Sequence, residues 1–128
     1  MISSHDALFV ECKPVDKDHP AGSAYCDEGL IRFVNGDYAW AMEEGLMLAY
    51  VRDGRTILKH LAPAISSSGR PEALGLMHPP RPCRGVAAEA VARAEAVHVT
   101  QHHRDFQWRD RKGPATDITV YHLWHLCT

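Results

Sequence analysis

The segment Gly45–Val51, GLMLAYV, restricts the possible folds of this chain more than any other stretch. It has the length of a strand and is too short for a fully buried helix. Its apolar residues follow one another without alternation, so a strand formed here would be hydrophobic on both faces. The pattern predicts a central strand covered on both sides, and such a strand needs neighbouring strands and covering helices.

Strand and helix signals alternate around this segment. Strands are predicted at 7–13, 96–103 and 116–127, helices at 24–42, 55–65 and 86–94, and a proline-rich surface loop at 66–84. Within the first helix, Gly29 and Gly36 either allow close packing on a sheet, or Gly36 ends the helix early. The last two strands are expected to form a hairpin. The order predicts one domain over residues 1–128, in the α/β class at its border with α+β, with helices flanking a mixed β-sheet.

Charge and hydropathy exclude several classes of protein. The net charge is −2 and the isoelectric point is about 6.5, so contact with nucleic acid would need a local basic patch. No apolar run approaches the roughly 20 residues of a membrane span, and MISSHDALFV lacks the basic start of a signal peptide. The four cysteines show no CxxC spacing and are interpreted as ordinary thiols. We therefore expect a cytoplasmic protein.

The first predicted strand carries two opposite charges. Glu11 and Lys13 share one face of it, whereas Val10 and Cys12 share the other, apolar face. A carboxylate suits Mg²⁺, the carbonyl of Cys12 offers a further ligand, and Lys13 is suited to orienting an attacking water. The same spacing also suits an ordinary ion pair on a surface strand. Both interpretations stay open at this point.

The surrounding segments resemble a known superfamily. FVECKPV, YCDEGLIRFVNGDYAWAM, GLMLAYVRDG and TDITVYHLWHL are together similar to the PD-(D/E)XK nuclease superfamily, over most of the chain from Leu8 to Leu126. The resemblance implies a restriction-endonuclease-like fold and hydrolysis of DNA phosphodiesters with Mg²⁺, or Mn²⁺ in its place. It implies catalytic roles for Glu11, Lys13 and Glu28, metal ligands from Glu11, Cys12 and Glu28, and a supplementary role for Arg32.

The chain departs from this family pattern at one position. The superfamily uses an aspartate on a strand upstream of the Glu-x-Lys strand, and Asp6 lies too close to Glu11 to replace it. This implies that the chain lacks the N-terminal part of the pattern, or that Glu28 or a partner subunit supplies the ligand. The alternative function is a catalytically inactive, truncated nuclease-like domain that binds protein or nucleic acid. A truncated sheet would leave an exposed edge beside Glu11, covered by the loop or by a second copy in a homodimer.

A basic segment, HHRDFQWRDRK, offers contacts for a DNA backbone. Its candidate residues, joined by Arg32 on the first helix, are His103, Arg104, Arg109 and Lys112. A charged hairpin tip would have a similar composition. Glu28 and Arg32 likewise fit an ion pair on a solvated helix face, unless the helix places them beside Glu11.

The nine histidines raise a zinc hypothesis. His102 and His103 end one predicted strand, and the next strand carries His122, His125 and Cys127. No zinc signature is present, and His122 and His125 point to opposite faces of a strand because they are three residues apart. Structural histidines are the favoured interpretation.

Overall fold

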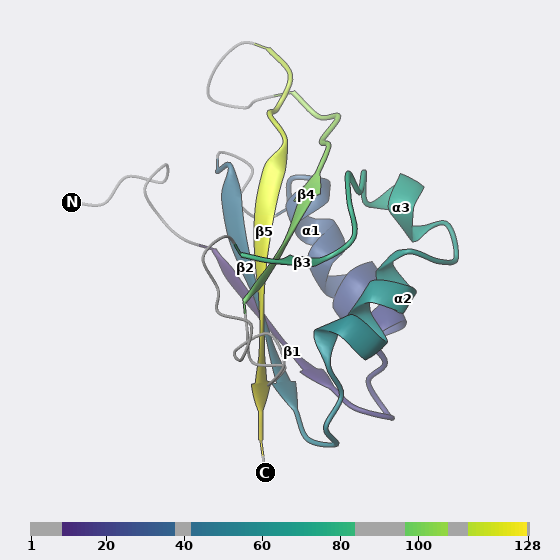
Figure 1. Ribbon diagram of the computed structural model, residues 1–128. Coiled ribbons are helices and arrows are strands. Elements are labelled where there is room, and N and C mark those ends of the chain that lie inside the picture. The colour runs from purple at the N-terminus through teal and green to yellow at the C-terminus, as the bar shows by residue number, and fades with distance from the viewer. Residues whose placement is uncertain (1–8, 38–41, 84–96, 108–112, 128) are drawn as a thin grey trace, which may run out of the picture.

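The computed structural model describes residues 9–37, 42–83, 97–107 and 113–127, which form a five-stranded sheet with helices on one side (Figure 1). The strands, in chain order, are β1 Val10–Val15, β2 Glu44–Val51, β3 Arg81–Pro82, β4 His98–His102 and β5 Ile118–Leu126. Their order in the sheet is β1-β2-β5-β4-β3. β1, β2 and β5 are parallel, whereas β4 runs antiparallel to β5 and β3. The predicted α/β class, mixed sheet and C-terminal antiparallel pair are confirmed.

Five short helical segments are present among the described residues. They are η1 Ala21–Leu30, α1 Ile31–Val34, η2 Ile57–Leu61, α2 Ala62–Ile65 and α3 Arg70–Ala73. η1 and η2 are π-helical, with i to i+5 hydrogen bonding, and each continues directly into an α-helix. The predicted helix 24–42 therefore begins earlier, at Ala21, and its regular part ends at Val34. Gly36, with φ of +85°, ends it early because this left-handed conformation suits glycine.

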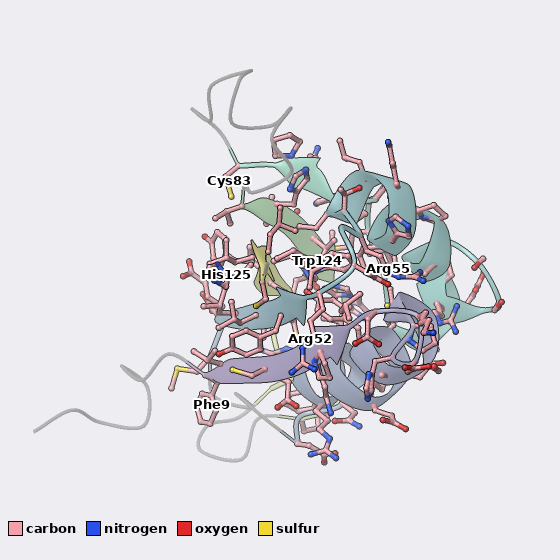
Figure 2. The ribbon with its side chains drawn as sticks, turned by 90° about the horizontal axis from the view of Figure 1, so that it is seen from below. Phe9, Arg52, Arg55, Cys83, Trp124 and His125 are labelled. Atoms are coloured by element: carbon pink, nitrogen blue, oxygen red, sulfur yellow. The ribbon has the colours of Figure 1, made fainter. Side chains whose placement is uncertain are left out.

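The two faces of the sheet differ in burial. Met47, Ala49 and Trp124 are buried under the helices, whereas Leu46 and Leu48 are half-buried on the other face and Tyr50 is 42% exposed. Figure 2 shows the side chains of Trp124 and His125 pointing to these opposite sides. Among the described elements, helices cover only one face of β2, so the prediction of cover on both faces is confirmed for that face alone. None of the described helices is long and apolar enough to cross a membrane.

The proline-rich segment lies along β4 instead of projecting as a loop. The amide of Met77 donates to the carbonyl of Gln101 at 2.9 Å, and the amide of Cys83 donates to that of Val97 at 3.0 Å. Gly75, with φ of +56°, accepts from the amide of His103 at 2.7 Å, so closely that a Cβ there would collide with the His103 carbonyl. This edge of the sheet is therefore covered. The predicted helix 86–94 lies outside the described residues.

The opposite edge is formed by β1. Within the ranges that the structure describes, β1 pairs only with β2. The exposed edge predicted beside Glu11 is present there, and the proline-rich segment that was expected as one possible cover lies at the other edge. Phe9 and Cys83 mark the two edges in Figure 2.

Candidate functional site

Glu11 and Lys13 point to the same side of β1, as the alternation predicts, and this is the helix-covered side. The Lys13 Nζ lies 3.5 Å from the Glu11 Oε1, and their side chains are 22% and 15% exposed. Gly29 of η1 lies above them, and a Cβ on it would be 3.3 Å from the Lys13 Cε and 3.0 Å from the Met47 Cε. The lysine stem therefore packs on the helix backbone, and the two charges keep partial access to solvent.

The peptide groups of β1 alternate between β2 and the open edge. The Leu46 amide donates to the Phe9 carbonyl at 3.0 Å, and Val10 is opposite Leu46 in the parallel register. In a parallel pair this directs the N–H and C=O groups of Val10 and Cys12 away from β2. Pro14 occupies the next outward position, where a missing N–H costs no ladder bond. The carbonyl of Cys12 thus faces outward beside Glu11.

The side chain of Cys12 is exposed on the face of β1 opposite the described helices. The face of β1 predicted from the sequence to be apolar is therefore the exposed one. The helices pack on the opposite side, where Gly29 admits the Lys13 stem and Val15 continues the buried row.

Two further carboxylates, Glu28 and Asp6, were considered beside Glu11 in the sequence. Glu28 is exposed on η1, and Asp6 lies outside the described residues. In the part of the chain that the structure describes, no group of three or more His, Cys, Asp or Glu side chains is arranged to hold a metal ion. Of the predicted metal ligands, Glu11 and the Cys12 carbonyl are adjacent on β1.

One of the basic residues predicted to contact the DNA backbone, Arg104, lies inside the protein. Arg104 is buried, and its Nε and Nη2 donate to the carbonyls of Thr116 and Met42 at 2.9 and 2.6 Å. Burial lowers the pKa of its guanidinium to about 10, although the nearby carboxylates of Glu43 and Asp117 oppose this shift. The predicted nucleic-acid contact is corrected: Arg104 holds together the segments that lead into β2 and β5.

The remaining basic candidates lie on the surface or outside the described residues. His103 is exposed, with its Nδ1 3.2 Å from the Asp117 Oδ1, and Arg32 is exposed on α1. Arg109 and Lys112 fall outside the described residues.

Sequence reasoning missed a chain of hydrogen bonds that lies fully inside the molecule. The Tyr25 hydroxyl is 2.7 Å from the His122 Nδ1, and the His122 Nε2 is 2.7 Å from the Thr100 Oγ1. Thr100 is also 2.7 Å from the His102 Nε2, and the His102 Nδ1 is 2.9 Å from the Leu74 carbonyl. All four side chains are buried. The chain connects η1, both antiparallel strands and the segment after α3.

Burial keeps both imidazoles of this chain neutral. It lowers the pKa of His102 to about 4 and that of His122 well below its usual value, and the neighbouring His98 and His102 add to the effect on His122. His78 acts in the same direction on His102. Burial also raises the pKa of the Tyr25 phenol well above its usual value, so Tyr25 is a neutral donor.

The zinc hypothesis placed histidines of the last two strands close together, and two of them do meet in this buried hydrogen-bond chain. His102 and His122 do come together, with Thr100 bridging them, whereas His103 and His125 are exposed elsewhere. The Cys127 thiol lies 3.9 Å from the His125 carbonyl. The alternation in β4 could have indicated this chain. It places three polar residues on the buried face of the strand, and buried polar groups need hydrogen-bond partners inside the protein.

The two constellations belong to one layer of the sheet. Glu11 is opposite Met47 in the register, Met47 is opposite His122, and His122 is opposite His98. All four side chains point to the helix-covered side. The apolar Met47 therefore separates the charged pair from the buried hydrogen-bond chain.

No protein-family model, curated protein or solved structure matches this chain. The resemblance to PD-(D/E)XK nucleases stays a prediction from the sequence.

Proposed function

We propose that the β1 edge is part of a cytoplasmic, metal-dependent phosphodiesterase site of the DNA endonuclease type. The observation that carries the proposal is the Glu11–Lys13 pair, 3.5 Å apart and partly exposed, beside the outward carbonyl of Cys12. A carboxylate, a carbonyl and an ammonium on adjacent residues combine the ligand and charge chemistry that phosphodiester hydrolysis needs. The resemblance to PD-(D/E)XK nucleases supports the same assignment.

Each residue has a separate part in this proposal. Glu11 and the Cys12 carbonyl would hold Mg²⁺, or Mn²⁺, with Glu28 completing the set if η1 brings it closer. Two protein oxygens fit Mg²⁺, which keeps several waters and completes its shell with substrate phosphate. The ion would supply Lewis acidity and a more acidic bound water. Lys13 would orient the attacking water and stabilise charge on the phosphate, and Arg32 and His103 would contact the DNA backbone.

The test compares plasmid nicking by the wild-type protein and by Glu11→Gln and Lys13→Met, with Mg²⁺ or Mn²⁺. Each variant removes one charge and keeps the size of the side chain. We expect nicking rates to fall about 100-fold or more, the usual cost of losing one electrostatic contact to the transition state.

Matched controls are Glu72→Gln on α3 and Lys59→Met on η2, both exposed and outside β1. These should nick as the wild type does. Equal nicking by all five proteins, with unchanged thermal unfolding, would exclude Glu11 and Lys13 from the activity.

A second candidate is a nuclease-like domain without catalysis that binds nucleic acid or protein. The observation that favours it is that the described residues hold no three-membered metal-binding group. Fluorescence anisotropy with labelled DNA in EDTA separates the two candidates. Binding that persists in Glu11→Gln, together with no nicking by the wild type, would support the second candidate.

A further inference from the structure

We propose that two copies of this chain join through β1, antiparallel, about a two-fold axis at Cys12, so that Glu11 faces the partner's Lys13. The inference goes beyond the proposed function and does not depend on it. The dimer hydrogen-bonds the outward Cys12 carbonyl that the metal site would use, so nicking would be an activity of the monomer. It commits to one occupant of the open edge, a second copy of this chain.

The first step is the state of the edge. The N–H and C=O groups of Val10 and Cys12 point outward, and none of the described residues pairs with them. Val10 and Tyr50 are 47% and 42% exposed, and Phe9, at the start of the strand, is 36% exposed. Unpaired strand edges with exposed apolar side chains are templates for pairing with another chain.

The second step is the register, which charge decides. Antiparallel pairing through the outward-facing residues places the two-fold axis at Val10, Glu11, Cys12 or Lys13. An axis at Lys13 sets two ammonium groups directly opposite each other, which is destabilising. An axis at Glu11 sets two carboxylates directly opposite each other, which is destabilising. An axis at Val10 sets Glu11 opposite the partner's Phe9, so Glu11 keeps only the Lys13 of its own chain as a charged neighbour. An axis at Cys12 sets Glu11 opposite the partner's Lys13, and Lys13 opposite the partner's Glu11. Only this register is self-complementary in charge.

The third step is where pairing stops. In the Cys12 register, Val10 is opposite the partner's Pro14 and donates its N–H to that carbonyl. Pro14 has no N–H to return, so the ladder closes after five residues on each chain. When β1 pairs with β1 of a second copy about a two-fold axis, neither β1 edge stays free for a third copy. At the other side of the sheet, the edge of β4 is already covered by residues 75–83. The assembly is therefore a closed dimer and not a fibre.

The test measures mass by light scattering over a range of concentrations, with a 14.3 kDa monomer as the reference. Glu11→Lys and Lys13→Glu each place like charges opposite each other and should raise the dimer dissociation constant at least 10-fold. The double variant restores opposite charges and should return the constant to within about 3-fold of the wild type. Glu72→Lys and Lys59→Glu are controls with the same changes in net charge, and they should dimerise normally.

A chemical cross-link checks the axis independently. Paired residues in an antiparallel ladder have Cα atoms about 5.5 Å apart, within disulfide range. Diamide, an azo oxidant, should take two electrons and two protons from the paired Cys12 thiols, become a hydrazine, and leave a covalent dimer. Cys12→Ser should abolish this product and Cys83→Ser should not.

Three results would overturn the proposal: a wild-type monomer at every concentration, a dimer insensitive to the single charge changes, or a double variant as monomeric as the single ones. The double variant also separates the two hypotheses, since it should regain the dimer while losing any nicking activity.

Discussion

At the scale of single residues, the Leu74 carbonyl fixes the direction of the buried hydrogen-bond chain. A carbonyl only accepts, so the His102 Nδ1 donates to it, and the Nε2 of this neutral ring accepts from the Thr100 hydroxyl. Thr100 has one proton, so it accepts from the His122 Nε2–H, and the His122 Nδ1 accepts from Tyr25. Each side chain thus has one permitted tautomer and role.

Removing the first donor should therefore expose a buried acceptor. We expect Tyr25→Phe to lower the free energy of unfolding by about 1–3 kcal/mol, because the His122 Nδ1 keeps no donor in the described structure. Tyr50→Phe removes an exposed hydroxyl and should change it by less than about 0.5 kcal/mol. Urea denaturation measures both. Equal effects from the two variants would show that the hydrogen bond to His122 contributes nothing to stability.

This chain also explains what sequence reasoning left out at the residue scale. The faces of Glu11, Lys13 and the β5 residues followed from alternation alone, which is a local property. Tyr25 and His122 are 97 positions apart, and their contact depends on where η1 packs on the sheet. Arg104 was misassigned for the same reason, since a basic residue in a polar segment resembles a surface residue until its carbonyl partners are known.

At the scale of elements, contact between α1 and β2 depends on a missing side chain. Gly45 lies under the Phe33 ring, and a Cβ at Gly45 would lie 2.5 Å from the Phe33 Cε1. Phe33 is fully buried, so moving its ring would disturb the surrounding core. The close approach of this helix to the start of β2 therefore requires glycine.

Gly45→Ala should accordingly lower the free energy of unfolding by about 1–3 kcal/mol through overpacking. Phe33→Leu removes part of the ring, so the double variant should be more stable than the sum of the two single effects predicts. A double-mutant cycle by urea denaturation measures this coupling. Strictly additive effects would mean that the alanine methyl finds space without moving Phe33.

The elements themselves were predictable to different degrees. Strands β2, β4 and β5 followed from their apolar or alternating patterns, and Gly36 was correctly considered as a helix end. The π-helical form of η1 was not predicted, because apolar spacing of three and four residues indicates a helix without specifying its hydrogen bonds. Residues 66–84 were predicted as a surface loop, but residues 75–83 lie along β4. Their pairing was not predictable, because it uses main-chain groups and leaves no periodic pattern in the side chains.

At the scale of the whole molecule, two buried neutral histidines make stability depend on pH. The pKa of His102 is about 4 and that of His122 is also depressed, whereas both are near 6.5 in an unfolded chain. The unfolded chain therefore binds more protons as the pH falls below about 6.5. Their contribution to stability is present above that pH and is lost as the pH falls toward 4.

We expect the free energy of unfolding to decrease between pH 6.5 and 4.5, with each histidine contributing at most about 1.4 kcal/mol per pH unit. The hydrogen bond between the Asp16 carboxylate and the His19 side chain lowers the pKa of Asp16 from 3.8. This group therefore changes stability below this window, and with the same sign. Urea denaturation across the pH series gives the slope, and His102→Gln should reduce it by about half. A flat profile over this window would contradict the assignment of neutral, buried imidazoles.

The position of β5 has a consequence for how the protein is made. β5 follows the other four strands in the chain, yet it lies between β2 and β4 in the sheet. At roughly 5–20 residues per second, a ribosome needs several seconds to go from the end of β2 to β5. During that time β2 has no neighbour on one side, and its apolar residues are open to chaperones or to other nascent chains. The sheet is therefore completed in one late step, when the strand that divides it in two is finally inserted.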